Sequence, residues 1–259
     1  MPAHPQPRLE TAGDPHPEPA AVVLVAHGGK AHSTAPATRR GLAYQRMRPF
    51  AGALERAGRA HRSERGEGVA VYLLRYRVRG WNGPAADAYA DAVWATGEIA
   101  RRHPDRPVVL VGHSMGGRAV LRAAGAPGVV GVCGLAPWLD ASDPVTQLAG
   151  RSVLIAHGDR ERMTDPAASY AYALRAREVT SRVARFDMLG DGHAMLRRAG
   201  DWTSLVRRFA LGELGAEPRD PLITNAMREP APAGLRVALE AGAGPRRPVT
   251  DPPNTKDRR

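Results

Sequence analysis

The stretch from Val108 to Val120 constrains this chain more than any other part of its sequence. The run of valines and leucine from Val108 to Val111 is typical of a buried strand. It stops at the segment 112–116, which reads Gly-His-Ser-Met-Gly, and small apolar residues in a helix-like pattern follow. This is the pattern G-x-S-x-G between a strand and a helix, where a serine occupies a turn so sharp that only glycine fits two residues to either side. The pattern predicts that Ser114 is a nucleophile.

Strands and helices alternate along the rest of the sequence. Apolar runs of strand length lie at 21–26, 69–75, 129–135, 152–156 and 182–188, besides the one that leads to Ser114. Segments of helical pattern lie between them, at 44–59, 84–102, 115–124, 166–178 and 201–211. This alternation predicts the α/β class, with a three-layer, doubly wound and mainly parallel sheet.

The two ends of the chain differ in composition from the middle. Residues 1–20 are rich in proline, which predicts a disordered leader, and residues 213–259 predict a mostly disordered Pro-rich tail with room for one short helix at 235–241. The expected domain is therefore 21–212. The sequence has no apolar run near the roughly 18 residues of a membrane span and no secretory signal, and its single cysteine, Cys133, cannot form an internal disulfide. We expect a cytoplasmic protein with no membrane partner.

The formal net charge of the chain is +11, and nearly all of its basic residues are arginine. A nucleic-acid surface needs a clustered basic stripe, usually with aromatic side chains for stacking. Here the arginines are scattered through helix-like segments, and aromatic residues make up only 5% of the chain. The distribution favours solvated helix faces and no nucleic-acid partner.

A serine nucleophile needs a base to accept its proton and an acid to orient that base. Of the nine histidines, His193 is the best candidate for the base, because it lies in a Gly-Asp-Gly-His loop after the last predicted strand. The loop after the strand 152–156 offers three acids, Asp159, Glu161 and Asp165. The chain order serine, acid, histidine is the one that this type of elbow requires, and all three acids satisfy it.

The first predicted strand ends in His27-Gly28-Gly29. Two consecutive glycines let backbone N–H groups turn toward a developing oxyanion, although an ordinary glycine turn has the same sequence. No His, Cys and acidic residues have the spacing of metal ligands, so we expect no metal and no cofactor.

Taken together, three separated motifs resemble the α/β-hydrolase family over about residues 21–211. They are the segment 27–29, the segment 112–117, and the pair formed by 157–161 and 192–193. The resemblance implies that Ser114 is the nucleophile, that His193 is the base, and that the amides of Gly29 and Met115 form the oxyanion hole. Members of this family commonly have Asp at the position of Glu161. Glu161 is our first candidate for the acid, and Asp159 is the alternative.

Many members of the family insert a helical lid between the strands at 129–135 and 152–156. Residues 136–151 are too few for such a cap domain, so the resemblance implies an α/β-hydrolase fold without a cap and an open, shallow pocket. We expect the following residues to line this pocket: His27, Gly28, His113, Trp138 and Trp81, with Met115 beside them.

These features predict a serine hydrolase that cleaves a carboxylic ester or thioester of a small molecule through an acyl-enzyme intermediate. Two alternatives use the same fold. One is an acyltransferase or peptidase with the same triad, and the other is a catalytically silent binding protein, for which Glu161 in place of Asp is the only support. The sequence does not indicate the oligomeric state.

Overall fold

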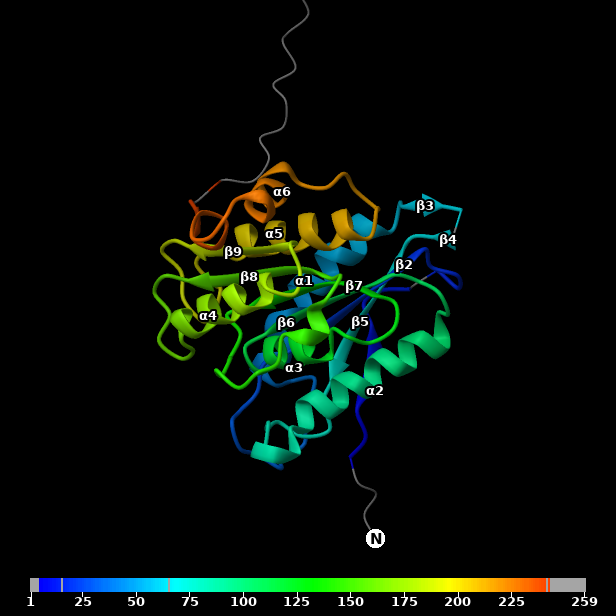
Figure 1. Cartoon of the computed structure of the whole chain (residues 1–259). Coiled ribbons are helices and arrows are strands. Elements are labelled where there is room, and N and C mark those ends of the chain that lie inside the picture. Colours follow the sequence, from blue (N-terminus) through cyan, green and yellow to red (C-terminus); the bar gives the residue numbers. More distant parts are fainter. Residues whose placement is uncertain (1–4, 15, 65, 241, 243–259) are drawn as a thin grey trace, which may run out of the picture.

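The central feature of the molecule is an eight-stranded sheet with strand order β1-β5-β2-β6-β7-β8-β9-β10 (Figure 1). It belongs to a computed structural model, which describes residues 5–240 and 242 apart from residues 15 and 65. The strands of the sheet are β1 (Arg8–Thr11), β2 (Ala21–Ala26), β5 (Val69–Arg75), β6 (Val108–His113), β7 (Val129–Leu135), β8 (Ser152–Gly158), β9 (Val183–Met188) and β10 (Val237–Leu239). Only β1 runs antiparallel to its neighbour, and a separate small hairpin joins β3 (Arg62–Ser63) to β4 (Gly66–Glu67).

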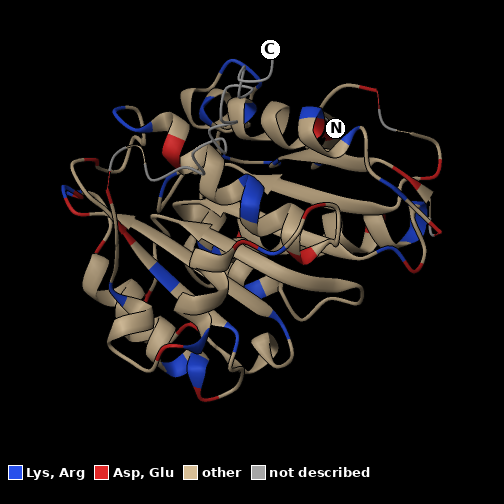
Figure 2. Ribbon diagram, turned by 90° about the horizontal axis from the view of Figure 1, so that it is seen from above, with Lys and Arg blue, Asp and Glu red and all other residues tan. Residues whose placement is uncertain are grey.

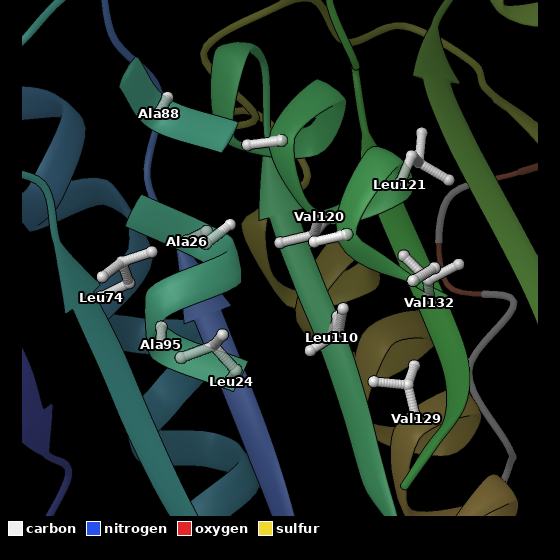
Figure 3. Packing of buried hydrophobic residues seen from close by; sticks show 14 of the residues in the cluster. Leu24, Ala26, Leu74, Ala88, Ala95, Leu110, Val120, Leu121, Val129 and Val132 are labelled. Atoms are coloured by element: carbon white, nitrogen blue, oxygen red, sulfur yellow. The ribbon is translucent and has the colours of Figure 1, made fainter. Parts of the chain in front are cut away.

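Helices cover both faces of the sheet. Buried residues of α1 (Leu42–Gly58), α5 (Ala199–Glu213) and α6 (Pro221–Arg228) pack in one apolar cluster, and those of α2 (Asp87–Arg102), α3 (Met115–Ala123) and α4 (Pro166–Arg177) pack in the other. Figure 1 shows the two groups of helices on opposite sides of the strands. Figure 3 shows the second cluster, in which Leu24, Leu74 and Leu110 meet small side chains of α2 and α3. The predicted three-layer, doubly wound, mainly parallel fold is confirmed.

The central strands consist almost entirely of apolar residues because both of their faces are covered. Every residue of β2 and of β6 is buried. Strand β2 pairs in parallel with both β5 and β6, so the strand order reverses direction between β2 and β6. In open α/β sheets ligands bind beyond the carboxyl ends of the strands at such a reversal. We therefore expect a ligand site in the segments that follow β2 and β6.

The connection between β7 and β8 is short and contains a single 3-10 turn, η2 (Thr146–Leu148). The other 3-10 turns are η1 (Gly83–Ala85), before α2, and η3 (Ala233–Leu235), before β10. No cap domain is inserted after β7, as the length of residues 136–151 predicted.

Both expected domain boundaries differ from the structure. Residues 8–11 form β1, which pairs with β5, and the buried side chain of Glu10 accepts hydrogen bonds from Arg39, Arg75 and Tyr44. Beyond residue 212, helix α6 begins at Pro221 with Asp220 as its N-cap, and β10 extends the sheet beside β9. Pro7 directly precedes β1 and Pro221 begins α6, and both are positions that proline permits.

The described sheet domain therefore extends from Arg8 to Leu239 and not from 21 to 212. The short helix expected at 235–241 is also wrong, because its centre forms strand β10. Residues 1–4 of the expected leader and residues 243–259 of the expected tail lie outside the described residues.

Charged residues surround this sheet without forming a single-sign stripe. Figure 2 shows Lys and Arg (blue) interspersed with Asp and Glu (red) around the periphery, while the sheet is mostly tan. No helix in the described part of the chain has the length and apolar character needed to span a membrane.

Candidate active site

Ser114 occupies a strained turn between β6 and α3. Its backbone has φ 56° and ψ −121°, a combination that non-glycine residues rarely adopt. A Cβ atom added to Gly112 would lie 2.3 Å from the carbonyl oxygen of Gly116, and one added to Gly116 would lie 2.4 Å from the carbonyl oxygen of His27. Backbone packs directly on backbone at both positions. A side chain on either glycine of the motif would therefore clash with a carbonyl group.

His193 lies beside this turn, in the loop that follows β9. Its Nε2 atom is 3.1 Å from Oγ of Ser114. The buried carboxylate of Asp191 holds the loop, because it accepts hydrogen bonds from the amides of Gly192 and Arg198 and from the indole N–H of Trp202. Asp191 belongs to the predicted Gly-Asp-Gly-His loop, but no sequence pattern indicates this anchoring role.

Glu161 contacts the opposite nitrogen of the same imidazole. Its Oε2 atom is 2.8 Å from Nδ1 of His193, and its side chain is fully buried. The carboxylate turns back onto its own loop, where Oε1 accepts hydrogen bonds from the amides of Arg162 and Met163, both at 2.7 Å. This folded-back arrangement accommodates the methylene by which glutamate exceeds aspartate.

The other two candidate acids do not reach His193. Oδ1 of Asp159 accepts a hydrogen bond from the amide of Gly190 at 2.7 Å. Asp165 is the N-cap of α4 and accepts from the amide of Ala167 at 2.8 Å. Of the three acids predicted in this loop, the structure brings only Glu161 to the histidine.

The surroundings of Glu161 favour its charged form. Burial alone would raise the pKa of this carboxyl, but the amide of Met163, the hydrogen bond and charge of His193 and the amide of Arg162 outweigh it and hold the pKa below its usual value. An ionised Glu161 accepts a hydrogen bond from Nδ1–H of His193, and in this tautomer the lone pair of Nε2 can accept the hydroxyl proton of Ser114.

His113 forms a hydrogen bond with the backbone of His193, the proposed base. Its Nε2–H donates to the carbonyl oxygen of His193 at 2.9 Å, and the two rings lie 4.7 Å apart. Burial, together with the charge of His193, lowers the pKa of His113 to about 3, so the ring is neutral at physiological pH. Its position in the motif predicted proximity to the pocket but not this bond to the backbone of the base.

The segment His27-Gly28-Gly29 lies directly on the Ser114 turn. A Cβ atom on Gly28 would lie 3.3 Å from Cβ of Ser114, and one on Gly29 would lie 2.4 Å from Cε of Met115. Within the described residues, the amides of Gly29 and Met115 have no hydrogen-bond acceptor. Two free N–H groups beside a serine hydroxyl are the kind of donors that form an oxyanion hole.

A cavity of about 580 Å³ adjoins Ser114 and His193. His27, Gly28 and His113 line it, as expected. Burial lowers the pKa of His27 to about 4, and its Nδ1–H donates to the carbonyl oxygen of Gly28. Residues that had not been predicted also line the cavity. They come from the loop before α1, from α1 and from the loop after β8, and they are Pro36, Thr38, Arg40, Leu42, Tyr44, Arg46 and Met163.

Trp81 and Trp138 do not line this cavity, which corrects the expectation. They line a neighbouring one, of about 360 Å³, together with Arg118. The guanidinium of Arg118 lies 4.5 Å from the ring of Trp81 and 4.9 Å from that of Trp138, and its Nε donates to Asp143 at 2.9 Å. The guanidinium thus packs against both indoles, which lie outside the lining of the cavity at Ser114.

No group of three or more His, Cys, Asp or Glu side chains in the described part of the chain is arranged to bind a metal ion. Thr164 is a further polar group near the base: its hydroxyl oxygen is 3.5 Å from Nδ1 of His193 and 3.1 Å from Nε2 of His157. Its position in the loop that carries Glu161 was the only signal for it in the sequence.

Comparison with known proteins agrees with this architecture. The model of the alpha/beta hydrolase family matches residues 22–253. An alpha-beta serine hydrolase homologue from Coxiella burnetii has a similar structure, with 14% identity, a TM-score of 0.57 and coverage of 78% of this chain and 90% of that one. For Est1E from Butyrivibrio proteoclasticus these values are 17%, 0.54, 81% and 94%.

Butyrate-bound esterase 2 from Thermogutta terrifontis is also similar, with 17% identity, a TM-score of 0.57 and coverage of 83% of this chain and 91% of that one. At such identities the likeness concerns the fold. A search of curated proteins gave no match. Because the family model matches most of the sequence and the sheet has the corresponding architecture, this chain belongs to the alpha/beta hydrolase family.

Proposed function

We propose that this protein is a serine hydrolase that cleaves a carboxylic ester or thioester of a small molecule through an acyl-enzyme. One observation carries the proposal: Oγ of Ser114, the imidazole of His193 and the carboxylate of Glu161 form a continuous chain of contacts of 3.1 and 2.8 Å. Ser114 and His193 line one cavity, so a substrate there reaches both of them. This constellation generates a nucleophile at neutral pH.

In the acylation half-reaction, Oγ of Ser114 forms a bond to the substrate carbonyl carbon while its proton moves to Nε2 of His193. The carbonyl π electrons move onto oxygen, and the amides of Gly29 and Met115 donate to that oxyanion. Each such donor is worth about 10²–10³ in rate. When the oxyanion collapses, the bond to the leaving alcohol or thiol breaks, and His193 returns the proton to the leaving group.

In the deacylation half-reaction, His193 accepts a proton from water as the water oxygen attacks the acyl carbon. Collapse of the second oxyanion breaks the bond to Oγ of Ser114, and the proton on His193 returns to Oγ. The products are the free acid and the original enzyme. Throughout, Glu161 holds Nδ1–H and stabilises the imidazolium.

Two further features support an ester or thioester as the substrate. Apolar residues line the cavity beside the catalytic serine, among them Pro36, Leu42 and Met163, and they suit a short or medium acyl chain. Esterase 2 from Thermogutta terrifontis, which has a similar fold, is named as an esterase.

The proposal predicts that a fluorophosphonate probe labels the wild-type protein at a single serine. Ser114→Ala should abolish the labelling, because the phosphorus must be attacked by this hydroxyl. Intact-protein mass spectrometry measures the adduct, and circular dichroism of the variant checks that it is folded. Absence of labelling in the folded wild type, or equal labelling of Ser114→Ala, would refute a serine hydrolase and favour a silent binding protein.

A series of p-nitrophenyl esters with rising acyl-chain length, followed by matched thioesters, then defines the acyl preference. The same reactions run with added alcohols show whether the acyl group is also transferred to an acceptor other than water.

A further inference from the structure

Four basic side chains line the cavity at Ser114, and we call them the cationic wall: Lys30, Arg40, Arg46 and Arg79. They come from the loop after β2 (Lys30), the loop before α1 (Arg40), α1 itself (Arg46) and the loop after β5 (Arg79). The backbone fixes two of these segments together, since the amide of Lys30 donates to the carbonyl oxygen of Arg79 at 2.8 Å. None of the described residues that line this cavity is acidic.

The cationic wall lacks counter-charges. In the described part of the chain, none of its four side chains forms an ion pair. Well-buried arginines elsewhere are paired: Arg118 with Asp143 at 2.9 Å, and Arg208 with Asp220 at 2.7 Å. Three of the four, Lys30, Arg40 and Arg79, are exposed and Arg46 is half-buried. The cavity is therefore lined by cations whose charge no described acidic side chain neutralises.

A second cavity continues this pattern around the base. His193 also lines a space of about 480 Å³ together with Arg160, Arg162 and Arg197. Its one acidic lining residue is Asp191, whose carboxylate is already occupied by the amides of its own loop and by Trp202. Both spaces next to His193 thus present unpaired cations.

The same cavity wall has an apolar component. Leu42 and Met163 line the cavity at Ser114, and they are the two most exposed large hydrophobic residues described, at 82% and 75%. A ligand that suits these surroundings has an apolar portion and an anionic group. Arginine matches a carboxylate or a phosphate particularly well, because its planar fork donates two parallel hydrogen bonds.

We propose that the site is selective for anionic esters or thioesters, in which a carboxylate or phosphate lies several bonds from the scissile carbonyl. The cationic wall binds the anion while Leu42 and Met163 contact the apolar segment. Positive potential in a cleft also raises the local concentration and the encounter rate of anions, and salt screens it. This inference rests on the proposed hydrolase function and adds its substrate class.

The first test compares two pairs of substrates, each with an anionic and a neutral member, and the salt dependence of each pair isolates the effect of charge. p-Nitrophenyl valerate and the p-nitrophenyl monoester of glutaric acid share leaving group and chain length, and only the second has a carboxylate on the acyl side. Butyryl-coenzyme A and butyryl-N-acetylcysteamine share the thioester, and only the first has phosphates on the leaving-group side. Ser114→Ala supplies the background rate for each.

We expect kcat/KM to be about tenfold or more higher for the anionic member of at least one pair, and this ratio to fall as NaCl rises from about 20 to about 500 mM. The pair that responds identifies whether the anion belongs to the acyl group or to the leaving group. Ratios near one in both pairs, at low salt, would overturn the proposal.

The second test uses Arg46→Gln, Arg79→Gln and the double variant. Each replacement should lower the anionic-to-neutral ratio about threefold, and the double variant about tenfold, as expected for contacts between partly exposed charges. Arg56→Gln is the matched control, because Arg56 is exposed on α1, outside this cavity, and its loss changes the net charge equally.

Arg56→Gln should keep the wild-type ratio. If Arg46→Gln and Arg56→Gln lowered the anionic-to-neutral ratio equally, the effect would come from net charge and not from the cationic wall, and the proposal would be overturned. If no ester of either charge is hydrolysed faster than by Ser114→Ala, the hydrolase function itself fails, and this outcome is distinct from hydrolysis without charge preference.

Discussion

At the scale of single residues, the carboxylate that orients His193 is the most informative feature of the site. Glu161 reaches Nδ1 of His193 only because its chain curls back, with its second oxygen on the amides of Arg162 and Met163. Glu161→Asp would withdraw the carboxylate by about 1.5 Å, the length of one carbon–carbon bond. It could then keep the histidine or the amides, but not both without a loop movement.

We predict that Glu161→Gln lowers kcat for a p-nitrophenyl ester by about 10³–10⁴, because an amide neither fixes the tautomer nor stabilises the imidazolium. Asp159→Asn is the matched control: the new side chain can still accept from the amide of Gly190, and kcat should change less than about threefold. Steady-state kinetics on both purified variants provide the measurement. The reverse order of the two effects would make Asp159 the acid.

The sequence places the three predicted catalytic residues in segments that follow strands, and the structure brings their side chains together. Ser114, Glu161 and His193 all follow strands, and the topology alone brings such positions to one edge of the sheet. The prediction that Trp81 and Trp138 line the cavity at Ser114 was wrong for a different reason. Their direction depends on Arg118, whose guanidinium lies against both rings, and no sequence pattern indicates such a tertiary contact.

At the scale of elements, the turn between β6 and α3 depends on close contact between backbones. A Cβ on Gly116 would lie 2.4 Å from the carbonyl oxygen of His27, so Gly116→Ala must displace either α3 or the loop after β2. We predict that it lowers the free energy of unfolding by about 2–4 kcal/mol. Urea denaturation followed by circular dichroism gives this value.

Gly97→Ala is the opposite case and serves as the control. Gly97 is exposed in the middle of α2, and nothing lies within 4 Å of an added Cβ there. The same substitution should raise the free energy of unfolding by about 1 kcal/mol, because alanine has the higher helix propensity. Equal effects of the two substitutions would mean that the close packing at Gly116 carries no cost.

The element-level prediction succeeded for the central strands and failed at the sheet edges. Strands such as β2 and β6 are recognisable because burial on both faces requires a continuous apolar run. Strand β1 has the sequence Arg-Leu-Glu-Thr and is held largely by its pairing with β5 and by the bonds to Glu10. A four-residue edge strand in a Pro-rich segment has no local signal, and its identity depends on a partner distant in the sequence.

At the scale of the whole molecule, three histidines lie at the carboxyl edge of the sheet, where three strands end. They are His27, His113 and His157, after or at the ends of β2, β6 and β8. All three are buried, with exposed fractions of 5%, 2% and 0%. Burial is the main cause that lowers the pKa of His27 to about 4, of His113 to about 3 and of His157 to about 4.

These pKa values make the stability of the fold depend on pH in a defined direction. An unfolded histidine titrates near pH 6.5, so between that pH and about 4 the unfolded chain binds protons that the folded chain does not. The free energy of unfolding must therefore fall as the pH falls through this window. Each of the three histidines contributes a slope of at most about 1.4 kcal/mol per pH unit.

His157→Gln tests this dependence away from the catalytic serine. Its ring contacts the hydroxyls of Ser169 and Thr164, which glutamine can also contact, and its Nε2 atom lies 3.8 Å from Oε2 of Glu161. We therefore expect a folded variant. Between about pH 6 and pH 5, the slope of the unfolding free energy from urea titrations should be about 1 kcal/mol per pH unit smaller than in the wild type. His32→Gln, at an exposed position, should keep the wild-type slope. Equal slopes for the wild type and His157→Gln would show that His157 binds its proton as readily folded as unfolded.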